Sequence, residues 1–212
     1  MPNKKDLQRV KNFEDLLAAF EATPLPGIAS PATRNVLAMQ IVDSLRRVEY
    51  AHHIRDAQHH PDRADPTSAM FDPFKAAVLS SRRGNIDEAY WLTFLGTHFG
   101  KHAQDGWRLC RDVYGRLQYG PIITWERVRD DFNEVAKWIP GDVAAMRADG
   151  VSRRFSNHRK YESLDQITAV ISSYRAWVVA YGGHGAMIQS LHQKFGQDPR
   201  EVFDALYSGM SQ

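Results

Sequence analysis

The stretch that decides the fold is Asp87-Glu88-Ala89-Tyr90-Trp91-Leu92-Thr93-Phe94-Leu95-Gly96-Thr97-His98-Phe99, the most apolar segment of the chain. Its length and its few polar positions predict a central, nearly buried helix. Asn85 or Asp87 can cap its start, and Gly96 and Gly100 are expected to loosen its end. We therefore take this segment as the core around which the other elements pack.

Helical patterns continue on both sides of this segment, because apolar residues recur every three or four positions. The predicted helices cover residues 5–21, 32–57, 74–80, 103–117, 124–138, 142–148, 164–181, 184–195 and 199–207, with a break at Pro140-Gly141. No alternation of period two is long enough for a strand. The prediction is an all-α chain, with an N-terminal helix and linker in residues 1–31 and a helical domain, of one or two lobes, in residues 32–212.

The composition is that of a soluble globular protein, with 43% hydrophobic and 25% charged residues among 212. The net charge is only +2, so affinity for phosphate has to come from local clusters of Arg and Lys. The single cysteine, Cys110, excludes an internal disulfide and a Cys-based zinc site, and we expect it to be a buried thiol. No signal-peptide pattern or long apolar run is present, which predicts a cytoplasmic protein without membrane contact.

A crowded polar stretch follows the apolar core: Phe155-Ser156-Asn157-His158-Arg159-Lys160-Tyr161-Glu162. Six consecutive polar residues would point all the way round a helix, so the stretch suits a loop or helix start that binds a polar, anionic ligand. Arg159 and Lys160 can neutralise phosphate, and Glu162 can act as a base. Asn157 can pair with a base or sugar edge, while Tyr161 can stack or donate a hydrogen bond. A structural alternative is a helix N-terminus, capped by Asn157, in which Arg159 and Glu162 bond locally.

A second cluster, Thr97-His98-Phe99-Gly100-Lys101-His102, precedes Trp107. His98 and His102 are four residues apart and would share one face of a continuous helix, which leaves a metal site as an alternative. Contacts to a polar substrate, or ordinary surface histidines, are the favoured interpretations.

Asp72 precedes Pro73, and this pair favours a helix cap over a catalytic role.

Several strings of this chain resemble the alpha-glutamyl/putrescinyl thymine pyrophosphorylase family, in the branch called clade 3. The resemblance covers about residues 40 to 190, and the family pattern has Gly where this chain has Ser156. The matching stretches are Arg63-Ala64-Asp65-Pro66, Phe71-Asp72-Pro73-Phe74-Lys75-Ala76-Ala77, Phe94 to His102, Trp107, Val113-Tyr114-Gly115-Arg116-Leu117 and Phe155 to Leu164.

This resemblance implies a fold like that of the helix-hairpin-helix DNA glycosylases and a link to hypermodified pyrimidines in phage DNA. It further implies one of two activities. One is attachment of an amine or amino acid to an activated thymine with loss of pyrophosphate; the other is removal of a modified base as a defence against phage. Residues 149–154 loosely match the hairpin of those glycosylases. The aspartate that should follow is missing, and the nearest acids are Glu162 and Asp165.

The leading hypothesis is a DNA glycosylase that flips a bulky, hypermodified pyrimidine out of double-stranded DNA into a polar pocket. A transferase acting on activated thymine is the first alternative, and a non-catalytic DNA-binding helical module is the second. The hypothesis involves no cofactor, no metal and no inferred protein partner. The candidate catalytic residues are Glu162, Lys160, Asp72 and Asp165; the substrate-binding residues are His98, Lys101, His102, Trp107, Asn157, His158 and Tyr161; the DNA-binding residues are Arg153, Arg154 and Arg159.

Overall fold

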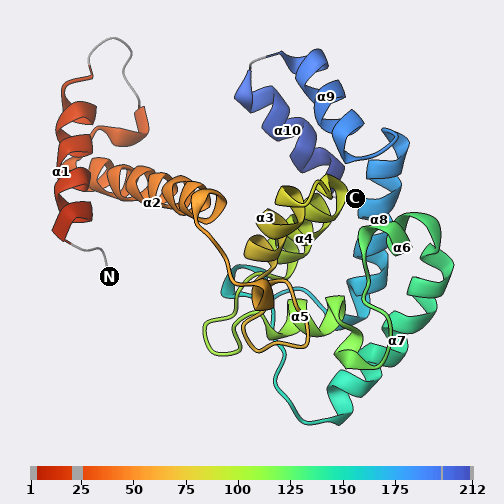
Figure 1. The fold of residues 1–212 in the computed structure, drawn as a ribbon. Coiled ribbons are helices and arrows are strands. Elements are labelled where there is room, and N and C mark those ends of the chain that lie inside the picture. Colours follow the sequence, from red (N-terminus) through yellow and green to blue (C-terminus); the bar gives the residue numbers. More distant parts are fainter. Residues whose placement is uncertain (1–3, 21–25, 197, 211–212) are drawn as a thin grey trace. The chain divides into compact units, whose positions relative to one another are not determined.

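A computed structural model describes residues 4–20, 26–196 and 198–210. The chain divides into two compact units, residues 1–57 and 58–212. Both units are helical, and the described residues contain no strand, only an isolated bridge between His102 and Gly106 (Figure 1). The all-α prediction is therefore confirmed. No helix among the described residues has both the length and the apolar character needed to cross a membrane.

The first unit is a pair of helices, α1 (Lys4–Ala18) and α2 (Pro31–Asp56), with a short 3₁₀ turn, η1 (Pro26–Ile28), before α2. Ser30 caps α2 by accepting a hydrogen bond from the Thr33 amide at 3.2 Å. Val10, Ala38 and Val42 form the buried apolar cluster of this unit, and Ile54 is buried near the end of α2. Other apolar residues of the predicted α2 stripe lie at the surface: Val36, Met39 and Val48. The predicted domain boundary at residues 31 and 32 falls at the start of α2 and stays a prediction.

The second unit is built around α4 (Ile86–Phe99), the predicted central helix. Trp91, Leu92, Leu95 and Phe99 are buried on it, and α3 (Pro73–Arg82) packs along it. Both helices begin as predicted. The Asp72 carboxylate accepts a hydrogen bond from the Lys75 amide at 3.3 Å, and the Asn85 side chain accepts one from the Glu88 amide at 3.2 Å.

The middle of this unit differs from the prediction at two places. The helix predicted for residues 103–117 is shortened to α5 (Arg108–Tyr114) and is followed by a 3₁₀ turn, η3 (Arg116–Gln118). The break predicted at Pro140-Gly141 is wrong, because α7 (Phe132–Ala148) continues through both residues. The break lies earlier, at Asp131, between α6 (Trp125–Asp130) and α7. Pro140 is exposed within α7, where water can solvate the carbonyl that lacks its helical partner.

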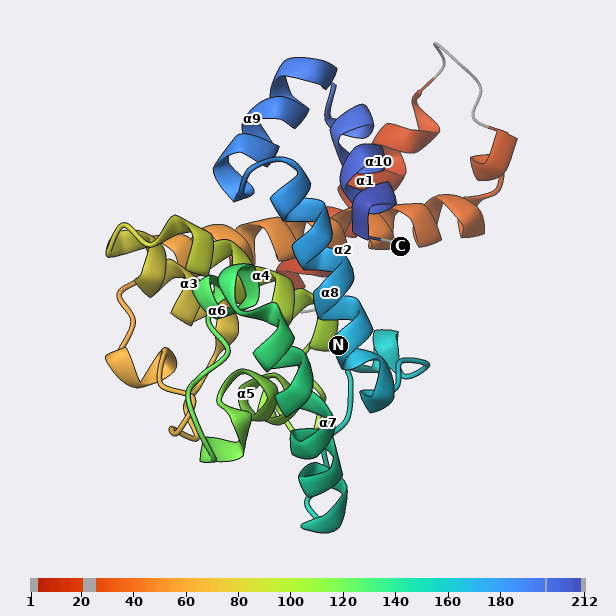
Figure 2. The ribbon, with the colours of Figure 1, turned by 90° about the vertical axis from the view of Figure 1, so that its right-hand side faces the viewer.

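The C-terminal part of the unit contains α8 (Ile167–Ala180), α9 (His184–Phe195) and α10 (Pro199–Met210). Two 3₁₀ turns, η4 (Asn157–Arg159) and η5 (Leu164–Gln166), precede α8. The polar stretch and α9 therefore lie at opposite ends of α8 (Figure 2). Residues 151–156 are not helical, and the next α-helix begins only at Ile167. The turn at residues 149–154 is thus not a hairpin that leads directly into a helix.

Candidate functional site

The two polar clusters of the sequence meet where α4 ends. The backbone amide of Ser156 donates a hydrogen bond to the carbonyl of Phe99 at 3.0 Å. Phe155 is buried and its ring lies 5.6 Å from that of Phe99. The polar stretch of residues 155–162 is therefore held directly against residues 98–100.

Gly100 makes this close approach possible. Its backbone, with φ 65° and ψ 165°, lies in a region that is essentially restricted to glycine. A Cβ atom at Gly100 would lie 2.4 Å from the Ser156 hydroxyl oxygen. Residue 100 is thus the position at which this chain requires glycine, whereas Ser156 has an ordinary φ of −59° that any residue can adopt.

The end of α4 at Phe99 separates the two histidines of the second cluster. His98 is the last basic residue of the helix, whereas His102 lies in the turn that its backbone closes with Gly106. They do not share one face of a continuous helix, so the interpretation as a helical metal-binding pair is wrong. Among the described residues, no group of three or more His, Cys, Asp or Glu side chains is placed to hold a metal ion.

His98 is buried among aromatic rings and lies next to a carboxylate. Its ring stacks on Phe94 at 5.9 Å and meets Phe155 edge to face at the same distance. Burial lowers the pKa of His98, and the nearby Glu162 carboxylate partly opposes that change. Its imidazole is therefore neutral at pH 7, with one ring nitrogen able to donate and the other to accept.

Glu162 is mostly covered, with its side chain 14% exposed, and its carboxylate forms an ion pair with Arg159 at 3.5 Å. The Glu162 amide also donates to the Arg159 carbonyl at 2.9 Å. The predicted local bonding of these two residues is therefore confirmed. Asn157 is not the cap of this turn, because Ser156 occupies that position without a side-chain hydrogen bond.

The other residues of the two clusters present their side chains to solvent. Tyr161 is 75% exposed and is free to stack on a ligand. Further exposed side chains in this region are those of Lys101, Asn157, His158 and Lys160. These residues form a polar rim beside the His98–Glu162 pair.

Three predicted residues lie outside this grouping. Asp72 caps α3 and has the Lys75 ammonium 3.8 Å away, while exposed Asp165 forms an ion pair with Arg147 at 2.8 Å. Trp107 lies edge to face against the Phe74 ring at 5.4 Å, and its buried indole N–H has no partner in the described part of the chain. No hydrogen bond or ion pair joins any of the three to Glu162 among the described residues.

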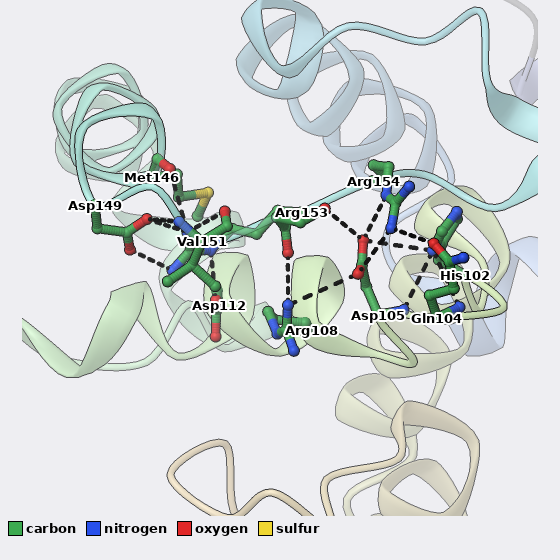
Figure 3. A network of polar contacts seen from close by, with 11 residues as sticks. His102, Gln104, Asp105, Arg108, Asp112, Met146, Asp149, Val151, Arg153 and Arg154 are labelled. Carbon is green, nitrogen blue, oxygen red and sulfur yellow. Dashed lines mark hydrogen bonds and ion pairs between the residues drawn. The ribbon is translucent and has the colours of Figure 1, made fainter.

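Arg153 is held inside the protein by acidic residues (Figure 3). Its guanidinium donates to Asp112 at 2.6 Å and to both carboxylate oxygens of Asp149, at 2.7 and 2.8 Å. It also reaches the carbonyls of Met146 and Val151. Each of the three guanidinium nitrogens therefore has a partner inside the protein, and the side chain is only 6% exposed, which leaves it unavailable to an external phosphate unless the fold opens.

Arg154 faces a different carboxylate, that of Asp105. Its guanidinium donates to both oxygens of Asp105, at 2.8 and 3.1 Å, and to the Gln104 side chain at 2.7 Å. The hydrogen bond from Arg154 is the largest cause that lowers the pKa of Asp105 to about 2. The amides of Gln104 and Asp105 both donate to Nδ1 of His102, so this buried histidine closes the turn.

Asp105 and Asp112 are the functional neighbours that sequence reasoning did not predict. Both are isolated acids in a part of the chain that lies more than 40 residues before the arginines they bind. The one available signal was the adjacent pair Arg153-Arg154, since two arginines on neighbouring positions of an extended segment point to opposite sides and need separate partners.

The fold and the site define an all-α protein in which a polar segment with a mostly covered carboxylate and an exposed rim is held against a buried histidine at one helix end. The chain belongs to the alpha-glutamyl/putrescinyl thymine pyrophosphorylase family, clade 3, whose sequence model matches residues 32–212. The name of that family refers to enzymes that process modified thymine. No curated protein and no solved structure matches the chain significantly.

Proposed function

We propose that the protein is a DNA glycosylase that removes a bulky, hypermodified pyrimidine from double-stranded DNA and leaves an abasic site. The observation that carries this proposal is the position of the polar stretch that contains Glu162, which is held against the buried His98 at the end of α4. The Phe155 ring meets the His98 ring edge to face at 5.9 Å, and the Ser156 amide donates to the Phe99 carbonyl at 3.0 Å. A carboxylate next to a weakly hydrated neutral imidazole supplies the acceptor and the donor that hydrolysis of an N-glycosidic bond needs. The exposed rim beside the pair has the polar groups to contact a flipped base.

In the proposed reaction, water attacks the C1′ carbon of the sugar as the bond to the base nitrogen breaks. The Glu162 carboxylate takes a proton from the water and stabilises the positive charge that develops on the sugar. The leaving base carries away the bonding electron pair and then receives that proton, while His98 donates a hydrogen bond to a pyrimidine oxygen. The products are a hydroxyl group at C1′ and the free base.

The state of the cations favours hydrolysis over the transferase alternative. Loss of pyrophosphate would develop several negative charges, which enzymes stabilise with cations aimed at the leaving group. Here Arg153, Arg154 and Arg159 are each bonded to a carboxylate. The two lysines of the region, Lys101 and Lys160, bear on a different route, in which a lysine amine attacks the sugar and forms a Schiff base. Such an amine is normally desolvated, whereas both of these are exposed, which favours water as the nucleophile. We therefore assign the hydrolytic route, with the transferase as the alternative.

The test is to incubate the protein with duplex DNA that carries hypermodified pyrimidines and to measure free base and abasic sites together. We expect both products in equal amounts, and a loss of at least about 100-fold in rate for Glu162→Gln. Glu134→Gln is the matched control, because it makes the same substitution at an exposed ion pair with Lys137 on α7, outside the candidate site. It should leave the rate unchanged.

The other outcomes decide between the alternatives. Intact strands that carry a new adduct would identify a transferase. Wild-type binding with no product of either kind would identify a non-catalytic module. Full activity of Glu162→Gln would show that another group acts as the base.

A further inference from the structure

Two adjacent arginines of the extended segment 151–156 are held in different ways. The Arg153 side chain is 6% exposed, whereas that of Arg154 is 49% exposed. Figure 3 shows them directed to opposite sides of the segment, Arg153 toward Asp112 and Asp149 and Arg154 toward Asp105. Arg154 is thus an ion-paired cation that solvent, and any ligand in solvent, can reach.

The Asp105 carboxylate does not depend on Arg154 alone. The Ser152 hydroxyl donates to it at 3.0 Å, and the Arg108 guanidinium lies 3.7 Å away. Arg108 is anchored beside it by a hydrogen bond to the Ser152 carbonyl at 2.8 Å. If Arg154 turned outward, Asp105 would therefore keep a hydrogen-bond donor and a cation.

We propose that Arg154 is an exchangeable ligand for DNA phosphate: a backbone phosphate replaces Asp105 on its guanidinium, and Arg108 and Ser152 keep the carboxylate in place. This inference rests on the DNA binding that the proposed function requires. The exchange is chemically balanced, because carboxylate and phosphate both accept paired hydrogen bonds from the N–H groups along the edge of the planar guanidinium. No buried charge is left without a partner. Arg153, with both its acids and two carbonyls, stays fixed and keeps the segment in position.

The consequence is a phosphate contact next to the candidate site. Arg154 directly precedes Phe155 and the polar stretch that ends at Glu162. A phosphate held there would place the neighbouring nucleotide beside the His98–Glu162 pair. In the free protein the same arginine is neutralised, which lowers its attraction for other anions.

The experiment measures binding of an unmodified DNA duplex by fluorescence anisotropy between about 50 and 200 mM salt, so that no catalysis is needed. Asp105→Asn should bind about two- to fivefold more tightly than the wild type, because the competing carboxylate is gone. Arg154→Ala should bind more weakly, and the slope of log affinity against log salt should fall by about 0.9, the value for one phosphate contact. The double variant should behave like Arg154→Ala.

Asp149→Asn is the matched control, since it removes the same charge from the partner of the buried arginine. Equal tightening by Asp105→Asn and Asp149→Asn would mean that only net charge matters and would overturn the proposal. Arg154→Ala decides the question by itself if Asp105→Asn does not fold: an unchanged salt slope overturns the proposal. A wild type that binds no duplex DNA overturns the proposed function as well, whereas a wild type that releases base while all variants bind alike overturns the exchange alone.

Discussion

Gly100 is the point at which the two polar clusters are closest, and replacing it with alanine tests whether they form one site. The added Cβ would lie 2.4 Å from the Ser156 hydroxyl oxygen and 2.5 Å from the Ser156 Cβ. Such distances are far inside van der Waals contact, so either the backbone at Gly100 or the stretch that begins at Ser156 has to move.

The expected cost has two parts. A side chain in this glycine region of the backbone costs about 1–3 kcal/mol, and forcing extra volume into a packed contact costs about another 1–3 kcal/mol. Gly100→Ala should therefore lower the free energy of unfolding by about 2–6 kcal/mol, measured by urea denaturation. Only the second part depends on Ser156.

A double-mutant cycle with Ser156→Gly separates these parts, because that change removes both atoms that an alanine at residue 100 would overlap. Ser156→Gly alone should cost about 0.5–1 kcal/mol through the added freedom of the unfolded chain. In the presence of Gly100→Ala it should instead relieve the overlap of about 1–3 kcal/mol, a net recovery of up to about 2 kcal/mol after its own cost, and release of the base should recover with it. Purely additive free energies would refute the contact between the two clusters.

Three further predictions concern the surrounding fold. Arg153→Ala removes one of the two arginines that bind the buried acid Asp112, the other being Arg111 at 2.9 Å, and should cost about 1.5–3 kcal/mol in urea denaturation. Arg147→Ala, at an exposed ion pair, should cost less than about 1 kcal/mol. Burial lowers the pKa of His184 below 6.5, although Asp87 opposes this, so the unfolded chain takes up a proton that the folded chain rejects. Melting temperatures should therefore fall as the pH drops below 6.5, and His184→Gln should flatten that slope. Cys110 is fully buried, which raises the pKa of its thiol, so a thiol reagent should modify it only after unfolding.

Local signals allowed the helix starts and the core to be predicted. Asp72, Asn85 and Thr124 each accept a hydrogen bond from an amide three residues later, which is a relation within one turn of chain. The central helix α4 was likewise predictable from the length and the apolar content of its own segment. The position of the polar stretch against residues 98–100 could not be predicted from local signals. It depends on a hydrogen bond between Ser156 and Phe99, which lie far apart in the sequence.

The turn after α5 shows why other features were not predictable. Arg116, Leu117 and Gln118 all have positive φ angles, between 51° and 68°, although none is a glycine. Each such residue is strained by itself. The turn is held because the Arg116 guanidinium bonds Asp142 at 2.9 Å and lies over the Trp138 ring at 4.2 Å. Both partners are on α7, more than 20 residues away, so no local pattern marks the turn.

The same dependence on distant partners changes the chemical meaning of the cationic run. As a sequence, Arg153, Arg154, Arg159 and Lys160 form a cluster of positive charge that favours phosphate. In the fold the three arginines are neutralised by Asp112, Asp105 and Glu162, and only Lys160 has no carboxylate partner in the described part of the chain. Under the proposed function, such a site would bind a DNA backbone by exchanging the exposed ion pair of Arg154, and it would offer few unpaired cations to a pyrophosphate group. This electrostatic balance is the reason why we propose release of a base, and the product assay with modified DNA decides between that reaction and transfer.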